Sequence, residues 1–246
     1  QLNNVLAEHD LALISGWFSG HLLTHSVEEE IIAIEGHLQL LKKGGATVMV
    51  YCEVTDAIHG DQNTPLSARP TISADGWQEF GERLSQVADY CLSQGVRLAY
   101  HHHMGTVVET SDDIDLLMEH TSDSLGLLLD SGHITYANGD SVAIIARHGA
   151  RIAHVHTKDV RFEVLKDAKN RNLSFLDSVL NGVFTVPGDG DIDYTQIFTA
   201  LRDLNYQGWL VVEAEQDPAI SHPLTYAKLG FKNIQNIAHQ AGLKLA

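Results

Sequence analysis

The chain has 246 residues, of which 44% are hydrophobic, and 16 basic against 32 acidic residues give a net charge of −16. This length and composition suffice for one large α/β domain with a sizeable core. The acidic balance argues against binding nucleic acid through its phosphates and against binding an anionic membrane surface.

The sequence also indicates the compartment. No apolar run approaches the roughly 18 residues that span a bilayer, and the first residues lack the basic segment of a secretory signal. Cys52 and Cys91 show neither a CxxC motif nor the spacing of a disulfide framework. We therefore expect a cytoplasmic protein that works in a reducing environment.

In chain order, the first predicted strand is the apolar run at 11–15, and glycines predict a loop at 16–20. Ser26 and Glu29 form a capping-box pattern that begins a helix over 27–43. A β-branched, nearly all-apolar run predicts the second strand at 47–51. Two long connections, 53–74 and 158–185, are of the length that usually carries function or moves.

The remaining elements follow the same alternation. Further strands are predicted at 96–100, 125–129, 152–156 and 208–213. Further helices are predicted at 77–93, 112–120 (capped by Ser111), 141–148, 175–180, 193–204 and 223–241.

Six short, apolar, non-alternating strands, each followed by a helical connection, predict a parallel α/β sheet. No glycine-rich phosphate loop follows the first strand, so a doubly wound nucleotide-binding fold has less support than a (β/α)₈ TIM barrel. A complete barrel typically needs about 250 residues. We therefore expect one barrel domain over 1–246 that lacks the first two βα units.

Polar residues that end apolar strands point to a site at the carboxyl edge of this sheet. Asp130 ends a leucine-rich strand and His133 follows it, which indicates a metal or substrate site, although a helix N-cap would also explain Asp130. His154 and His156 share one strand face. For His154 an inner-layer, hydrogen-bonded histidine is the better interpretation.

Three consecutive histidines follow the strand at 96–100. Alternation places His101 and His103 on one face and His102 on the other. Imidazoles carry protons near neutral pH or bind metals. Glu213 and Glu215 likewise share a face after the last strand, and one of them is predicted to be a ligand and the other a supporting or solvated carboxylate.

Four further residues have two interpretations each. Trp17 stacks on a polyol ring or plugs the barrel rim. Lys158 and Arg161 hold substrate hydroxyls or are exposed loop charges. Glu53 is an acid–base group or, more simply, a loop carboxylate.

The chain resembles the inosose dehydratases of the xylose isomerase-like TIM barrel superfamily. The stretches that carry the resemblance span the chain in family order: SGWFSG (15–20), GVRLAYHHHMGTVVET (95–110), LLLDSGH (127–133), RIAHVHTKDVR (151–161), GVFTVPGDGDIDY (182–194) and GWLVVEAEQDP (208–218).

The resemblance implies a lyase that dehydrates 2-keto-myo-inositol to a trihydroxycyclohexane-1,2-dione in inositol catabolism. It implies metal ligation by Asp130, His156 and Glu213, with His101 where distant relatives carry a glutamate ligand. The catalytic residues that it implies are His101, His102, His103 and Glu213. The substrate-binding residues that it implies are Trp17, His133, Lys158 and Arg161.

The resemblance further implies a divalent metal, Mn or Co, and associates glutathione with the family. The expected partner is a small polyol ketone, without nucleic acid or membrane, and a homo-oligomer is left open. The alternative is a metal-dependent ketose epimerase or isomerase, which would use a similar enolate. A DNA-repair nuclease of the same fold is disfavoured by the acidic charge, and a non-catalytic binding protein would retain no affinity for a transition metal.

Overall fold

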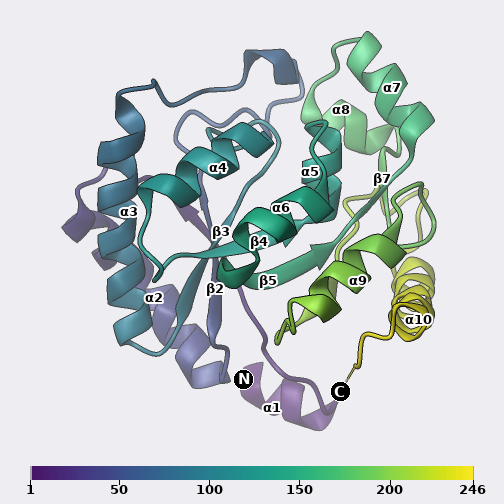
Figure 1. The fold of residues 1–246 in the computed structure, drawn as a ribbon, viewed down its shortest axis with the longest axis horizontal. Coiled ribbons are helices and arrows are strands. Elements are labelled where there is room, and N and C mark those ends of the chain that lie inside the picture. Colours follow the sequence, from purple (N-terminus) through teal and green to yellow (C-terminus); the bar gives the residue numbers. More distant parts are fainter. Residues whose placement is uncertain (1, 246) are drawn as a thin grey trace.

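In a computed structural model that describes residues 2–245, a six-stranded parallel sheet forms the centre of the molecule. Its strands lie side by side in the order β1-β2-β3-β4-β5-β8, so each is paired with the next one of the sheet along the chain (Figure 1). This sequential order is that of a barrel and not of a doubly wound sheet. The strands of the sheet are β1 (Trp17–Gly20), β2 (Val48–Glu53), β3 (Arg97–His101), β4 (Gly126–Asp130), β5 (Ile152–Thr157) and β8 (Leu210–Val212).

Helices cover the outer face of the sheet, as in a (β/α) barrel (Figure 1). The helices are α1 (Leu2–Glu8), α2 (Val27–Gly44), α3 (Gly76–Ser93), α4 (Ser111–His120), α5 (Ser131–Tyr136), α6 (Ser141–His148), α7 (Phe162–Asn170), α8 (Phe175–Leu180), α9 (Tyr194–Asp203) and α10 (Pro223–Ala241). Two single 3₁₀ turns, η1 (Leu66–Ala68) and η2 (Gly149–Arg151), and a two-stranded antiparallel pair, β6 (Asp159–Val160) and β7 (Phe184–Thr185), complete the structure of the described residues.

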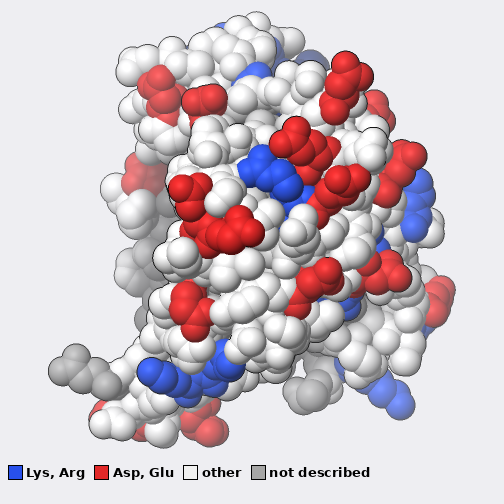
Figure 2. All heavy atoms as spheres, turned by 90° about the vertical axis from the view of Figure 1, so that its left-hand side faces the viewer, with Lys and Arg blue, Asp and Glu red and all other residues white. Residues whose placement is uncertain are grey.

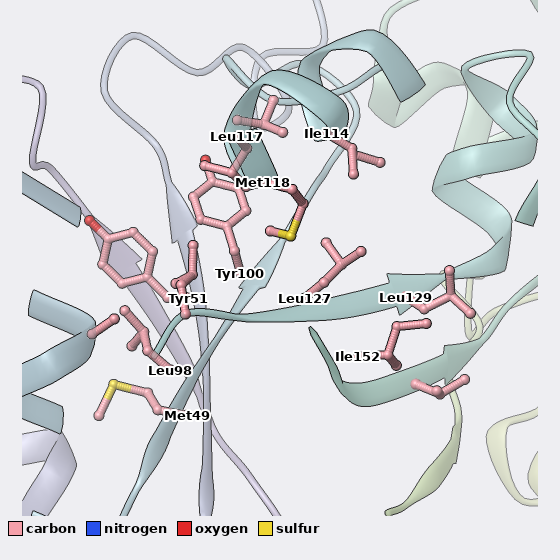
Figure 3. Close-up of a cluster of buried hydrophobic side chains, with 14 of the residues drawn as sticks. Met49, Tyr51, Leu98, Tyr100, Ile114, Leu117, Met118, Leu127, Leu129 and Ile152 are labelled. Atoms are coloured by element: carbon pink, nitrogen blue, oxygen red, sulfur yellow. The ribbon is translucent and has the colours of Figure 1, made fainter. Parts of the chain in front are cut away.

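The main core lies between the sheet and its helices. Tyr100 of β3 and Leu127 of β4 lie next to Leu117 and Met118 of α4, and Leu98 lies beside Met49 of the neighbouring strand (Figure 3). The alternate strand residues form a smaller apolar cluster on the inner face, made of Val48, Val50, Ala99 and Leu128. Strand alternation therefore decides which strand-end residues enter the barrel interior.

Most predicted elements are confirmed, often to within a residue or two. The Ser26–Glu29 capping box begins α2, since each partner's side chain bonds the other's backbone N–H. Helices α6, α8 and α10 have the predicted bounds. The cap of α4 is wrong by one residue, because Thr110, not Ser111, accepts the hydrogen bond from the Asp113 N–H.

The predicted first strand was wrong. The run at 11–15 is not a strand; β1 instead occupies the segment expected to be a loop, where Trp17 pairs with Val50 and Gly20 with Glu53. Gly20 is no loop breaker, because a Cβ atom there would lie 2.0 Å from the ring of Tyr51. The glycine leaves room for that ring in the outer core.

Seven short elements were not predicted: the helices α1, α5 and α7, the 3₁₀ turns η1 and η2, and the strands β6 and β7. Helix α5 has only six residues and begins directly at the end of β4, where Asp130 is both strand residue and N-cap. A separate apolar cluster that includes Phe175 and Phe184 packs beneath the long connection carrying α7 and α8. That packing orders a segment whose local sequence is mostly polar.

Acidic side chains are spread over the face formed by α2 and α3, with small groups of basic side chains between them (Figure 2). Among the described residues, no helix combines the length and the apolar character needed to cross a membrane. Both cysteines are buried, and burial raises the pKa of the Cys91 thiol to about 12.

Candidate metal centre

Four polar side chains meet at the carboxyl ends of neighbouring strands, and we call them the ligand cluster: His101, Asp130, His156 and Glu213. His101 and Asp130 end β3 and β4, and Asp130 is the register partner of His156 on β5. The Asp130 Oδ2 atom lies 3.6 Å from His101 Nε2 and 3.6 Å from His156 Nδ1. One nitrogen or oxygen from each of the four residues lies within 4.8 Å of the others.

Four converging atoms of the ligand cluster are buried and make no hydrogen bond: His101 Nε2, Asp130 Oδ2, His156 Nδ1 and Glu213 Oε2. Two of them, His156 Nδ1 and Glu213 Oε2, lie 2.7 Å apart as an ion pair. Buried polar atoms without partners are rare and costly, so four of them at one point require an explanation. Two imidazoles and two carboxylates are the donor set that a divalent transition metal binds. These residues therefore fit a metal ion.

Other bonds aim the ligand atoms. His101 Nδ1 donates to the carbonyl oxygen of His102 at 2.5 Å, which leaves the Nε2 lone pair facing the cluster. Asp130 Oδ1 accepts the backbone N–H groups of Gly132 and His133 at 2.9 and 3.0 Å, so one oxygen caps α5 while the other faces the cluster. The N-cap interpretation of Asp130 is therefore confirmed, and its second oxygen is left free for the site that the sequence predicts.

The electrostatics of the ligand cluster favour a bound cation. Burial opposes ionisation of Asp130, but the Lys158 ammonium and His133 outweigh it and hold the pKa of the carboxyl well below its usual range. Burial also lowers the pKa of His156, yet the carboxylates of Asp130 and Glu213 overcome this and raise it to about 9. The carboxylates thus favour a positive charge at this point of the cluster.

A second group, which we call the lysine cluster, lies beside the first and contains His103, His133, Glu215 and Lys158. The rings of His103 and His133 are 4.0 Å apart between centroids. The fully buried Lys158 Nζ lies 2.9 Å from His133 Nε2 and 2.5 Å from Glu215 Oε2. Burial would lower the pKa of Lys158, but the surrounding carboxylates raise it above its ordinary value.

Among the other predicted residues, Trp17 lies at the site, with its ring 5.3 Å from that of His101 and 41% of its surface exposed. His102 lies behind the ligand cluster, where its Nε2 accepts the Asp130 N–H at 3.3 Å. His154 sits one layer below and bonds Ser15, as an inner-layer histidine would.

The structure does not bring Arg161 or Glu53 to the cluster. The Arg161 guanidinium bonds the Gly182 and Phe184 carbonyls and the Asp189 carboxylate, tying the long connection together. Glu53 accepts the N–H groups of Leu23 and Thr55. Alternation along β2 turns Glu53 to the outer face with Tyr51, away from the interior.

His59 was missed by the sequence predictions. It lies on the connection after β2, its ring is 5.1 Å from that of His103, and its Nδ1 is buried without a partner. The loop is fixed there because the Ile58 N–H donates to the carbonyl of Gly105 at 2.9 Å. Only the length of the connection indicated that it has a function; nothing in its sequence pointed to His59.

Comparisons with known proteins bear on the whole chain. Residues 1–237 match a family model described as "Xylose isomerase-like TIM barrel". The chain is 47% identical over 245 residues to the rhizopine catabolism protein MocC of Rhizobium meliloti, covering 100% of this chain and 75% of that protein. It is 43% identical over 228 residues to an inosose dehydratase of Clostridium perfringens, covering 92% of this chain and 77% of that enzyme.

Among solved structures, the fold is similar to that of the IOLI protein with a bound zinc atom. The TM-score is 0.65 at 16% identity, and the match covers 99% of this chain and 80% of that one. At this identity the likeness concerns the fold alone.

Proposed function

The chain belongs to the xylose isomerase-like TIM barrel family, and on that basis we propose that it is a metal-dependent hydro-lyase that dehydrates 2-keto-myo-inositol. The proposal rests on the 40–43% identity to inosose dehydratases over most of the chain. The observation that carries the chemistry is the set of four buried, unpartnered ligand atoms at the strand ends. The product is a trihydroxycyclohexane-1,2-dione.

In this proposal His101, Asp130, His156 and Glu213 hold one divalent ion, Mn²⁺ or Co²⁺, since mixed imidazole and carboxylate donors suit such metals better than Mg²⁺. When bound, the ion acts as a Lewis acid on the ketone oxygen of the substrate. The sequence-based assignment of His101 and Glu213 as proton carriers gives way to a ligand role, because their free atoms already converge on the cluster.

The proton carriers are His103 and Glu215, which lie next to the ligand cluster without converging on it. His103 Nδ1 donates to the Met104 carbonyl, and its Nε2 faces Glu215 Oε1 at 3.8 Å. Lys158 helps to hold Glu215 as a carboxylate, with a pKa of about 2 although burial opposes ionisation. Dehydration removes a proton from the α-carbon and adds one to the departing β-hydroxyl, so one carboxylate–imidazole pair serves both transfers.

His102 has a positioning role, because its Nε2 is engaged by the Asp130 N–H. Trp17 offers its exposed ring to the apolar face of the cyclic polyol. Glutathione and a cytoplasmic location are retained as parts of the proposal that come from the family resemblance.

The test is a direct assay. Chelator-treated protein is incubated with 2-keto-myo-inositol, with and without added Mn²⁺ or Co²⁺, and the ultraviolet absorbance of the conjugated product is followed. We expect the absorbance to rise only with metal. A metal-loaded, folded protein that gives no absorbance would contradict the dehydratase proposal, and conversion to an epimeric ketose, detected by NMR, would instead support the epimerase alternative.

A further inference from the structure

The ligand cluster and the lysine cluster have similar donors but differ in how these are satisfied. Both contain histidine nitrogens and carboxylate oxygens within 4.8 Å of one another. In the ligand cluster all four facing atoms lack hydrogen-bond partners. In the lysine cluster, His133 Nε2 and Glu215 Oε2 both contact the Lys158 ammonium. The ammonium occupies the place of a cation in the second donor set.

Each of the four residues at 130–133 contacts Lys158. Asp130 Oδ2 lies 3.5 Å from Nζ, and His133 Nε2 lies 2.9 Å from it. Ser131 Oγ accepts the backbone N–H of Lys158 at 3.1 Å and donates to its carbonyl at 2.9 Å. Gly132 leaves space for the aliphatic stem, because a Cβ atom there would lie 2.6 Å from Lys158 Cγ.

The remaining surroundings also keep the ammonium in place. Glu213 Oε2 lies 3.2 Å from Nζ, and the ring of Phe184 lies 5.2 Å away. His133 Nε2 and Glu215 Oε2 are the hydrogen-bond partners of the ammonium, and the Glu213 carboxylate completes its surroundings as an ion-pair partner. A second metal ion on His133 and Glu215 would need the volume that the ammonium fills.

The charge balance also favours one divalent ion over two. Asp130, Glu213 and Glu215 carry three negative charges around one ammonium, so two negative charges remain. One divalent cation neutralises them, whereas two would leave a buried site with two uncompensated positive charges, which is strongly unfavourable.

We propose that Lys158 is a built-in cation that fills a second metal position, so that the centre takes one divalent ion per chain and removal of the lysine creates a second metal site on His103, His133 and Glu215. This inference rests on the proposed metal site in the ligand cluster. The lysine cluster is thereby reserved for the hydroxyl groups of the substrate.

The experiment is a count of bound ions. Protein freed of metal is titrated with Co²⁺ by calorimetry, and the bound metal is then measured by elemental analysis after equilibrium dialysis. We expect one ion per wild-type chain and two per Lys158→Met chain. The double variant Lys158→Met/His133→Asn should return to one ion, and Lys169→Met, which removes a lysine outside both clusters, should also bind one.

The outcomes separate the two proposals. A wild-type chain that binds two ions, or a folded Lys158→Met chain that still binds one, would overturn this inference and leave the dehydratase proposal standing. A wild-type chain that binds none would overturn both. If Lys158→Met does not fold, Gly132→Ala replaces it, because the added methyl group displaces the lysine stem and should also raise the count above one.

Discussion

Two buried polar networks lie near the strand ends of this molecule, and only one of them has the features of a site. On the outer face, the fully buried Glu30 of α2 accepts the Tyr51 hydroxyl at 2.9 Å and contacts His25 Nδ1 at 2.7 Å. On the inner face, the ligand cluster has four buried atoms that make no hydrogen bond, although two of them, His156 Nδ1 and Glu213 Oε2, lie 2.7 Å apart as an ion pair. Buried carboxylates and histidines therefore occur both in a hydrogen-bond network that stabilises the fold and in a candidate metal centre.

What separates the two networks is unsatisfied bonding capacity. In a hydrogen-bond network that serves only stability, the buried polar atoms satisfy one another's hydrogen-bonding capacity. In a metal site, the ligand atoms are satisfied only when the ion is bound. Supporting hydrogen bonds orient these residues, and their free lone pairs face the position of the ion. This difference predicts that substitutions in the first network affect stability and substitutions in the second affect metal binding.

The largest effect is expected from Asp130→Asn. The amide keeps an acceptor for the α5 N–H groups but removes the anionic ligand, so metal-dependent turnover should fall by about 100-fold or more. Turnover and metal affinity are measured beside the circular dichroism spectrum and the melting temperature, which should change little. Unchanged turnover would place the centre elsewhere.

A smaller effect is expected from His102→Phe, which removes the acceptor of the Asp130 N–H behind the ligand cluster. Loss of such supporting bonds typically lowers metal affinity by about 10–100-fold. Competition with a coloured chelator measures the affinity. His102→Gln, which can supply an acceptor at the same place, should lose less, and equal losses would indicate a packing defect instead.

The other network is tested with Tyr51→Phe. Removing a donor from buried Glu30 should lower the free energy of unfolding by about 1–3 kcal/mol, measured by urea denaturation, with metal affinity unchanged. Tyr90→Phe is the matched control, because it removes a similar bond to Glu35 from a partly exposed position and should cost less. A fall in metal affinity for Tyr51→Phe would contradict the prediction that the Glu30 network affects stability alone.

The smallest effect is expected from His59→Phe at the edge of the lysine cluster. Its free Nδ1 has no protein partner, so we expect it to bind a substrate hydroxyl and the variant to raise KM several-fold, equivalent to about 1 kcal/mol, with kcat nearly constant. His239→Phe, an exposed histidine on α10, is the control. An equal change in both variants would remove His59 from the site.

The fold was largely predictable, because it depends on patterns that are local in sequence. Apolar runs, the Ser26 capping box and the order of strands and helices indicated a barrel-type sheet that the structure confirms. The first strand was not, because Gly20 looks like a loop residue until the Tyr51 ring is seen above it. Such a requirement comes from a residue about thirty positions away.

The ligand cluster was foreseen from strand ends together with the family resemblance, and its role as a metal site remains a prediction. Alternation placed His101 with His103 and His154 with His156, but it did not reveal that Lys158 would be buried between carboxylates. Nor did it show that Arg161 would bond the long connection. A long side chain reaches partners in several directions, and only the packed structure decides among them.

The close contact between Gly132 and Lys158 has an evolutionary consequence. Because the hydrogen atom of one residue and the methylene stem of the other occupy adjoining space, we expect the residues at the two positions to change together. A side chain at position 132 would displace the lysine stem from its place, so homologues that lack the glycine should lack the lysine as well.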